Sequence, residues 1–160
     1  IDGETVFQGF RHLIKAKIKV IEHKVSYVTA QITHSYRPAE IGDLVMEYTP
    51  RNKVLTVEDN PAPINSRIIC SQDDHLMVND FIIGFIDAGK NTVKPGQIYT
   101  VLRKNIVVGK KTVWPQKKEE SMELENLQSG KLIVLHTEDT TSTIMVLSSG
   151  YAIHPNDPVN

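Results

Sequence analysis

The chain is poor in the features that most often identify a protein. Its one cysteine, Cys70, excludes an internal disulfide and is compatible with any compartment. The formal net charge of −1 provides no overall field that would attract nucleic acid or an anionic membrane. No apolar run approaches the ~20 residues that a membrane-spanning helix needs. What remains is the composition of a soluble globular protein, with 40% hydrophobic and 23% charged residues.

The start of the chain has neither a signal peptide nor a methionine. We therefore expect a fragment or a processed form of a longer protein, whose N-terminal part holds the cellular address. The length of 160 residues corresponds to one ordinary domain or two small ones.

Two segments of the chain, 114 positions apart, carry nearly the same pattern. Lys17–Val45 and Lys131–Val159 align without a gap and share the order strand, turn, strand and aspartate turn. Six of the 29 aligned pairs are identical: Lys17/Lys131, Val20/Val134, Thr29/Thr143, Ser35/Ser149, Asp43/Asp157 and Val45/Val159. This pattern indicates a repeated β unit, and such units share a core and carry function on their surfaces and loops.

Period-two alternation is the main structural signal, as where lysines alternate with Ala16, Ile18 and Val20. After a polar linker, Thr49 to Ser66, short apolar runs alternate with turn clusters. No long segment shows a helical period. The fold class that follows is all-β, with two related small β-barrel-like or curled-sheet units.

The predicted domains are a first β unit at 1–58 and a second at 66–160. We expect the first to be completed by sequence upstream or by its neighbour. An irregular, exposed and mobile excursion is predicted at 104–130, with one helical turn at Met122–Leu127. The predicted second core comprises Ile68, Leu76, Val78, Phe81, Ile83, Phe85, Val101, Leu132, Val134, Ile144 and Val146.

Three segments resemble a bacterial envelope family. They are FIIGFIDAGKN at Phe81–Asn91, VKPGQIYTVLRK at Val93–Lys104, and the ending from Gly130 to Val159. They are similar to the C-terminal β region of lysin-motif (LysM) peptidoglycan-binding proteins and, distantly, to the C-terminal domain of flagellar assembly protein T. The resemblance implies a periplasmic or envelope location and an accessory role. It also implies that peptidoglycan is bound through an upstream LysM module, or that the partner is an envelope protein.

Two departures from the family pattern fall in its turns. Gln97 follows Pro95-Gly96 where the family has aspartate, and Asn156 precedes Asp157 where it has glycine. Because asparagine also tolerates the left-handed conformation, we expect the second turn to survive.

Candidate chemistry is sparse, and we predict no catalytic residue, no metal site and no cofactor. The Asp73-Asp74-His75 cluster is best explained as a solvated turn. Cys70 follows two isoleucines and is predicted to be an inert buried thiol. Asp43 and Asp157 could act as paired carboxylates, but we favour the interpretation that each hydrogen-bonds its own turn.

The predicted binding residues surround the single tryptophan. Trp114 is flanked by Lys110, Lys111, Lys117 and Lys118, and an exposed indole among cations could stack on a sugar or anchor a partner protein. The alternative, which we favour, is that Trp114-Pro115 folds back to cap a barrel end.

Three functions follow as expectations. The first is a non-catalytic envelope module, the C-terminal part of a LysM-type protein, that docks a protein or acts as a spacer. The second is a flagellar or secretion assembly factor of the periplasm. The third and least favoured is a cell-wall hydrolase, because no positioned base is found.

Overall fold

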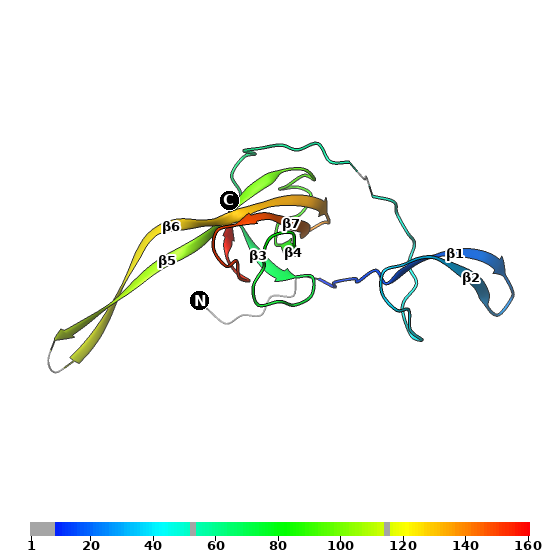
Figure 1. Cartoon of the computed structure of the whole chain (residues 1–160), viewed down its shortest axis with the longest axis horizontal. Coiled ribbons are helices and arrows are strands. Elements are labelled where there is room, and N and C mark those ends of the chain that lie inside the picture. The colour runs from blue at the N-terminus through cyan, green and yellow to red at the C-terminus, as the bar shows by residue number, and fades with distance from the viewer. Residues whose placement is uncertain (1–8, 52–53, 114–115) are drawn as a thin grey trace. The chain divides into compact units, whose positions relative to one another are not determined.

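The computed structural model describes residues 9–51, 54–113 and 116–160, with the side chains of 106–123 left aside (Figure 1). Every regular element within these ranges is a β-strand, so the predicted all-β class is confirmed. The chain divides into two compact units: unit 1, Ile1–Lys53, and unit 2, Val54–Asn160. Unit 1 holds a two-stranded sheet and unit 2 a closed barrel, which confirms the expected small barrel-like or curled-sheet architecture.

Unit 1 is built on an antiparallel hairpin. Strands β1 (Ala16–His23) and β2 (Val28–Ser35) pair along their length, with Ile18 opposite Ile32 and Val20 opposite Ala30. The connecting turn is closed by Lys24 N, which donates to Tyr27 O at 2.9 Å.

Unit 2 is a barrel of six strands in the order β3-β4-β7-β6-β5-β8. The barrel closes where Ser66 of β3 lies opposite Val159 of β8. Glu58, upstream of the barrel, forms a parallel bridge with Gln97. The strand bounds are β3 (Ser66–Ser71), β4 (Ile83–Ile86), β5 (Ile98–Val113), β6 (Gln116–Thr137), β7 (Ser142–Ser149) and β8 (Pro158–Val159).

The barrel core confirms most of the predicted apolar positions. Seven of them are fully buried: Ile68, Val78, Val101, Leu132, Val134, Ile144 and Val146. The alternation that buries Leu132 and Val134 on β6, and Ile144 and Val146 on β7, has the expected phase. Exclusion of these side chains from water is the main stabilising term of unit 2.

The predicted core is wrong between β3 and β4. Leu76 and Phe81 lie in the connection between these strands and are 84% and 71% exposed. On β4 the inward residues are Gly84 and Ile86, whereas Ile83 and Phe85 are only half-buried. The predicted inward positions of β4 are shifted by one residue from the observed ones. FIIGFI is apolar at every position except its glycine, so no alternation of polar and apolar residues marks the buried face.

The stretch 104–130 is also corrected. It forms neither an irregular excursion nor a helical turn, because β5 and β6 continue as one paired hairpin to Val113 and Gln116 (Figure 1). Residues Leu124–Gln128 are exposed on β6, so this part carries no buried face to produce a periodic pattern. Cross-strand backbone pairing satisfies its polar groups instead.

Candidate functional site

The two copies of the repeat have the same backbone pairing, residue for residue. Shifting β1 and β2 by 114 positions gives Gly130–Thr137 of β6 and the whole of β7. Ile18↔Ile32 corresponds to Leu132↔Val146, and Val20↔Ala30 corresponds to Val134↔Ile144. Both hairpins carry register shifts at the same two places. The sequence repeat therefore describes one structural unit present twice.

The aspartate turn is also the same in both copies. Asp43 Oδ2 accepts from Glu40 N at 2.7 Å, and Asp157 Oδ2 accepts from His154 N at 2.8 Å. These bonds confirm that each aspartate serves its own turn. The third position is left-handed in both, with φ of 98° at Gly42 and 71° at Asn156, so the expected tolerance of asparagine is confirmed.

A third turn of the same kind precedes β5. Gln97 Oε1 accepts from Lys94 N at 2.8 Å, and Gly96 has a φ of 97°. Gln97 thus makes the bond that aspartate makes in the other two turns. Its amide also donates to Glu58 Oε2 at 2.9 Å, which ties the turn to the preceding segment.

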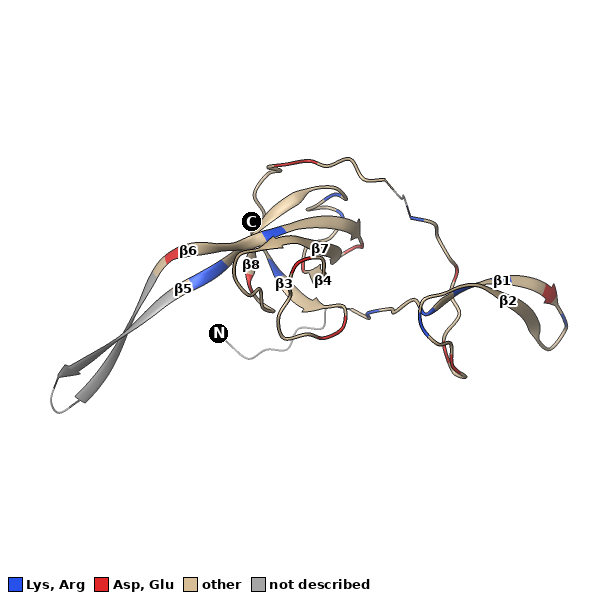
Figure 2. Cartoon of the chain, viewed as in Figure 1, with Lys and Arg blue, Asp and Glu red and all other residues tan. Residues whose placement is uncertain are grey.

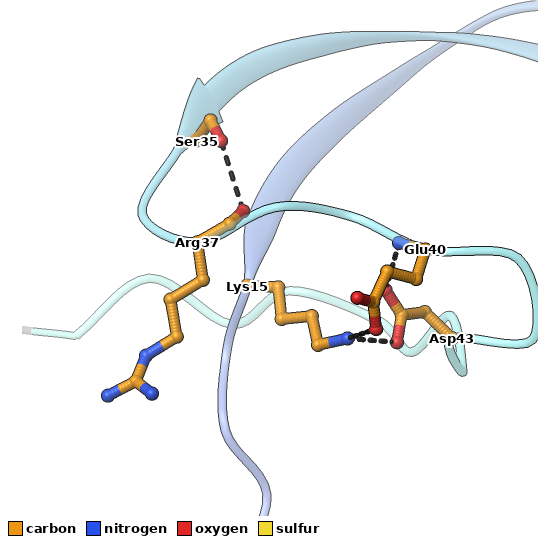
Figure 3. A network of polar contacts seen from close by, with 5 residues as sticks. All are labelled: Lys15, Ser35, Arg37, Glu40 and Asp43. Atoms are coloured by element: carbon orange, nitrogen blue, oxygen red, sulfur yellow. Dashed lines mark hydrogen bonds and ion pairs between the residues drawn. The ribbon is translucent and has the colours of Figure 1, made fainter.

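The charges around the turn differ between the copies. Lys15 Nζ lies 2.7 Å from Asp43 Oδ1 and 3.0 Å from Glu40 Oε2, while Ser35 Oγ donates to Arg37 O at 3.1 Å (Figure 3). The hydrogen bond from Lys15 lowers the pKa of the Asp43 carboxyl, and the same bond raises the pKa of Lys15. Lys15 therefore holds two carboxylates at the base of the hairpin.

In unit 2, Ser129 stands at the position of Lys15 and His154 at the position of Glu40. His154 Nδ1 lies 4.0 Å from Asp157 Oδ2. Ser129 Oγ is buried and has no hydrogen-bond partner among the described residues. The second copy has therefore kept the fold of the turn without a lysine at the position of Lys15.

The largest difference between the copies is burial. The apolar side chains that face the barrel core in unit 2 are solvent-exposed in unit 1. Ile18 is 43% exposed where Leu132 is 0%, and Val20 is 57% exposed where Val134 is 0%. Ile32 is 53% exposed where Val146 is 0%. We call the surface formed by Ile18, Val20, Ala30 and Ile32 the open face.

The edges of the hairpin are open as well. In unit 2, β6 is flanked by β5 and β7 is flanked by β4. Among the residues that the structure describes, β1 and β2 pair only with each other. A strand edge presents unpaired N–H and C=O groups, and an exposed apolar face beside it marks an interaction site. The open face and its edges are therefore the candidate functional site.

The binding residues predicted from the sequence lie elsewhere. Trp114 is outside the described residues. The backbones of Lys110, Lys111, Lys117 and Lys118 lie on β5 and β6, where Lys111 is opposite Lys118, and their side chains are outside the described set. Binding at these residues stays a prediction.

The other polar candidates do not form a site. His75 N donates to Ser71 Oγ at 2.6 Å within the turn that carries Asp73 and Asp74. The described part of the chain contains no group of three or more histidine, cysteine or acidic side chains placed to hold a metal ion. Cys70 is half-buried on β3 rather than buried. Lysines, arginines and acidic residues are spread along the described parts of both units (Figure 2).

Comparison of the chain with protein-family models, with curated proteins and with solved structures finds no match. Within the described ranges, no helix has the length and apolar character needed to cross a membrane.

The open face could have been found from the sequence by a further step. Mapping the predicted core of the second copy onto the first assigns Ile18, Val20 and Ile32 to a core. The mapping therefore identifies these three residues as an apolar face of the first copy that another strand would have to cover.

Proposed function

We propose that this chain is a non-catalytic module of the bacterial cell envelope that docks to a protein through the open face of unit 1. The observation that supports it is the contrast between Val20 and Val134, which occupy equivalent positions in the two copies of the hairpin. The Val20 side chain is 57% exposed, whereas that of Val134 is 0% exposed. A two-stranded hairpin is at best marginally stable alone, and burial of its apolar face supplies the missing stabilisation. Docking of a partner provides that burial.

The envelope location rests on the resemblance to the C-terminal region of LysM-type proteins. In that setting an upstream LysM module binds peptidoglycan and this chain holds a protein partner or acts as a spacer. The distant resemblance to flagellar assembly protein T favours a periplasmic assembly factor as the alternative. Both alternatives use the same surface, and co-purification with flagellar basal bodies separates them.

A pair of neighbouring substitutions tests the docking function. Ile32→Asp places a charge on the open face, whereas His34→Asp places the same charge at a position of β2 whose counterpart in unit 2, Ser148, stays exposed. The measurement is the amount of protein complex recovered from solubilised envelopes by size-exclusion chromatography. We expect Ile32→Asp to lose the complex and His34→Asp to keep it. Equal recovery of both would contradict docking through this face.

Sedimentation with purified peptidoglycan sacculi tests the role of the glycan. We expect the chain by itself to remain in the supernatant, because the proposal assigns glycan binding to a separate module. If the chain sediments, it has a glycan site of its own. In that case Trp114→Ala, with Lys110 and Lys117 changed to glutamine in separate variants, locates it.

A further inference from the structure

In unit 2, the surface that corresponds to the open face is covered by other strands of the barrel. The hairpin of β6 and β7, which lies 114 positions later, pairs with β5 on one edge and with β4 on the other. Ile68 of β3 packs in the same core. We propose that the open face receives a stretch of polypeptide with three short strands, patterned like β3, β4 and β5, which completes unit 1 as a second barrel. The proposal rests on the docking function above and specifies the chemistry of the partner.

The first attachment is at the outer edge of β1. In unit 2, residues 98–101 of β5 pair with residues 130–133 of β6. Val134 N donates to Gln97 O at 2.9 Å, and Gly96 N donates to Val134 O at 2.8 Å. The corresponding groups of unit 1 are the edge of Ala16–Lys19 and the backbone N–H and C=O of Val20. A β5-like strand would pair antiparallel to β1 at these groups.

The second attachment is at the outer edge of β2. Residues 83–86 of β4 pair with residues 142–145 of β7, in register from Ile86↔Ser142 to Ile83↔Met145. Shifted by 114 positions, the receiving segment is Val28–Gln31. A β4-like strand would therefore pair antiparallel to β2 over four residues.

The third attachment is the aspartate turn. In unit 2 this turn holds Ile68 of β3 by two backbone bonds: Asn156 N donates to Ile68 O at 2.7 Å, and Ile68 N donates to Asp157 O at 3.0 Å. Gly42 and Asp43 present the same two groups in unit 1. One residue of a β3-like strand would be fixed between them.

The side chains that the partner must supply follow from the core of unit 2. Ile68, Ile86 and Val101 are fully buried in one cluster with Leu132, Val134, Ile144 and Val146. The last four correspond to the residues of the open face. The partner therefore needs a large apolar residue at each of the three positions that correspond to Ile68, Ile86 and Val101.

Charge complementarity adds a feature that unit 2 does not have. Lys19 is exposed on β1 at the position of Ile133, which lies opposite Ile98 of β5. Opposite charges on directly facing positions of paired strands are favourable, and two apolar residues face each other there in unit 2. We expect the partner to carry an aspartate or glutamate in place of Ile98.

A polypeptide fits this surface better than a glycan or a lipid. The two edges present alternating N–H and C=O groups at the spacing of a strand, and another extended backbone pairs them in a regular ladder. A lipid would cover the apolar face and leave both edges unpaired, which is costly once water is excluded.

Photo-crosslinking in the host that produces the protein tests the partner. Benzoylphenylalanine replaces Val20 in one variant and, in a control variant, His34, whose counterpart Ser148 stays exposed in unit 2. The crosslinked peptides are sequenced by mass spectrometry. We expect the Val20 variant to crosslink one polypeptide segment with three short runs of alternating apolar residues. The control should give at least five-fold less of that product. Adducts on glycan, on lipid, on a second copy of this chain or on a segment without this pattern would overturn the proposal.

Hydrogen exchange on the recovered complex provides a second measurement that needs no substitution. Exchange of the Val20 amide should slow at least tenfold in the complex, because a partner carbonyl accepts from it as Gln97 O accepts from Val134 N. The Val134 amide is bonded already and should not change. An unchanged Val20 amide would exclude strand addition at β1. If Ile32→Asp and His34→Asp are recovered equally, docking itself fails. If only Ile32→Asp loses the complex but the Val20 variant crosslinks to something other than a segment of three short strands, docking through the open face is supported. The proposed structure of the partner is then contradicted.

Discussion

Val20 and Val134 occupy the same position in two copies of one β unit, yet Val134 is fully buried and Val20 is 57% exposed. Each lies opposite its equivalent neighbour, Ala30 and Ile144, in the same register. The backbone pairing is therefore the same in both copies, whereas the surrounding strands differ. Burial at this position is decided by tertiary context rather than by the hairpin itself.

The same truncation should consequently have different effects in the two copies. Val134→Ala removes two buried methyl groups and leaves a cavity, so it should lower the free energy of unfolding of unit 2 by about 2 kcal/mol. Val20→Ala acts on an exposed side chain and should change stability by less than about 0.5 kcal/mol. Urea unfolding followed by circular dichroism measures both. Equal losses would mean that the open face is covered within the isolated chain.

Ser129→Ala should stabilise the barrel. The Ser129 hydroxyl is buried without a hydrogen-bond partner among the described residues. An unsatisfied buried polar group costs about 1–3 kcal/mol, so its removal should raise the free energy of unfolding by about 1 kcal/mol. A melting temperature that falls instead would show that a water molecule or another group satisfies this hydroxyl. Ser148→Ala, an exposed change on β7, is the matched control and should be neutral.

The turn before β5 depends on its glycine. Gly96 has a φ of 97°, and a Cβ added there would lie 2.0 Å from Thr56 O. Gly96→Ala should therefore destabilise unit 2 by about 2 kcal/mol or more, from backbone strain together with the clash. Asn156→Gly is the contrast, because glycine adopts the left-handed conformation at least as readily as asparagine, and it should be nearly neutral. Thermal unfolding distinguishes the two, and a neutral Gly96→Ala would contradict the geometry of this turn.

Sequence patterns predicted the parts of the fold that depend on local order. The repeat, its two aspartate turns and the phase of β6 and β7 follow from Lys17–Val45 and Lys131–Val159, because matching turns and alternation specify matching hairpins. The phase of β4 could not be predicted, since both faces of FIIGFI are apolar and the inward position is a glycine, Gly84.

The candidate site was missed for a different physical reason. Alternation shows that Ile18 and Val20 share a face, but it does not show whether another strand covers that face. The outer part of the β5–β6 hairpin was missed because its described residues 103–104 and 124–128 are exposed, so they leave no alternation of buried and exposed positions. In both cases the deciding information is the neighbouring strand, which no local pattern contains.

The ion pair at the base of unit 1 should give a pH dependence with two limits. The pKa of Asp43 is lowered from 3.8 by the bond to Lys15, so its stabilising contribution is present above 3.8 and is lost as pH falls through the lowered value. The pKa of Lys15 is raised above 10.5, so its contribution is present below 10.5 and is lost as pH rises through the raised value. The turn should therefore be most ordered between about pH 4 and 10.

Titration of the Asp43 carboxyl by NMR should show its pKa rising towards 3.8 in Lys15→Met. In Lys24→Met, which removes the separate pair with Glu22, it should not move. If Lys15→Met leaves the Asp43 titration unchanged, the backbone bond from Glu40 N is what lowers its pKa, and the contact with Lys15 contributes nothing to the turn.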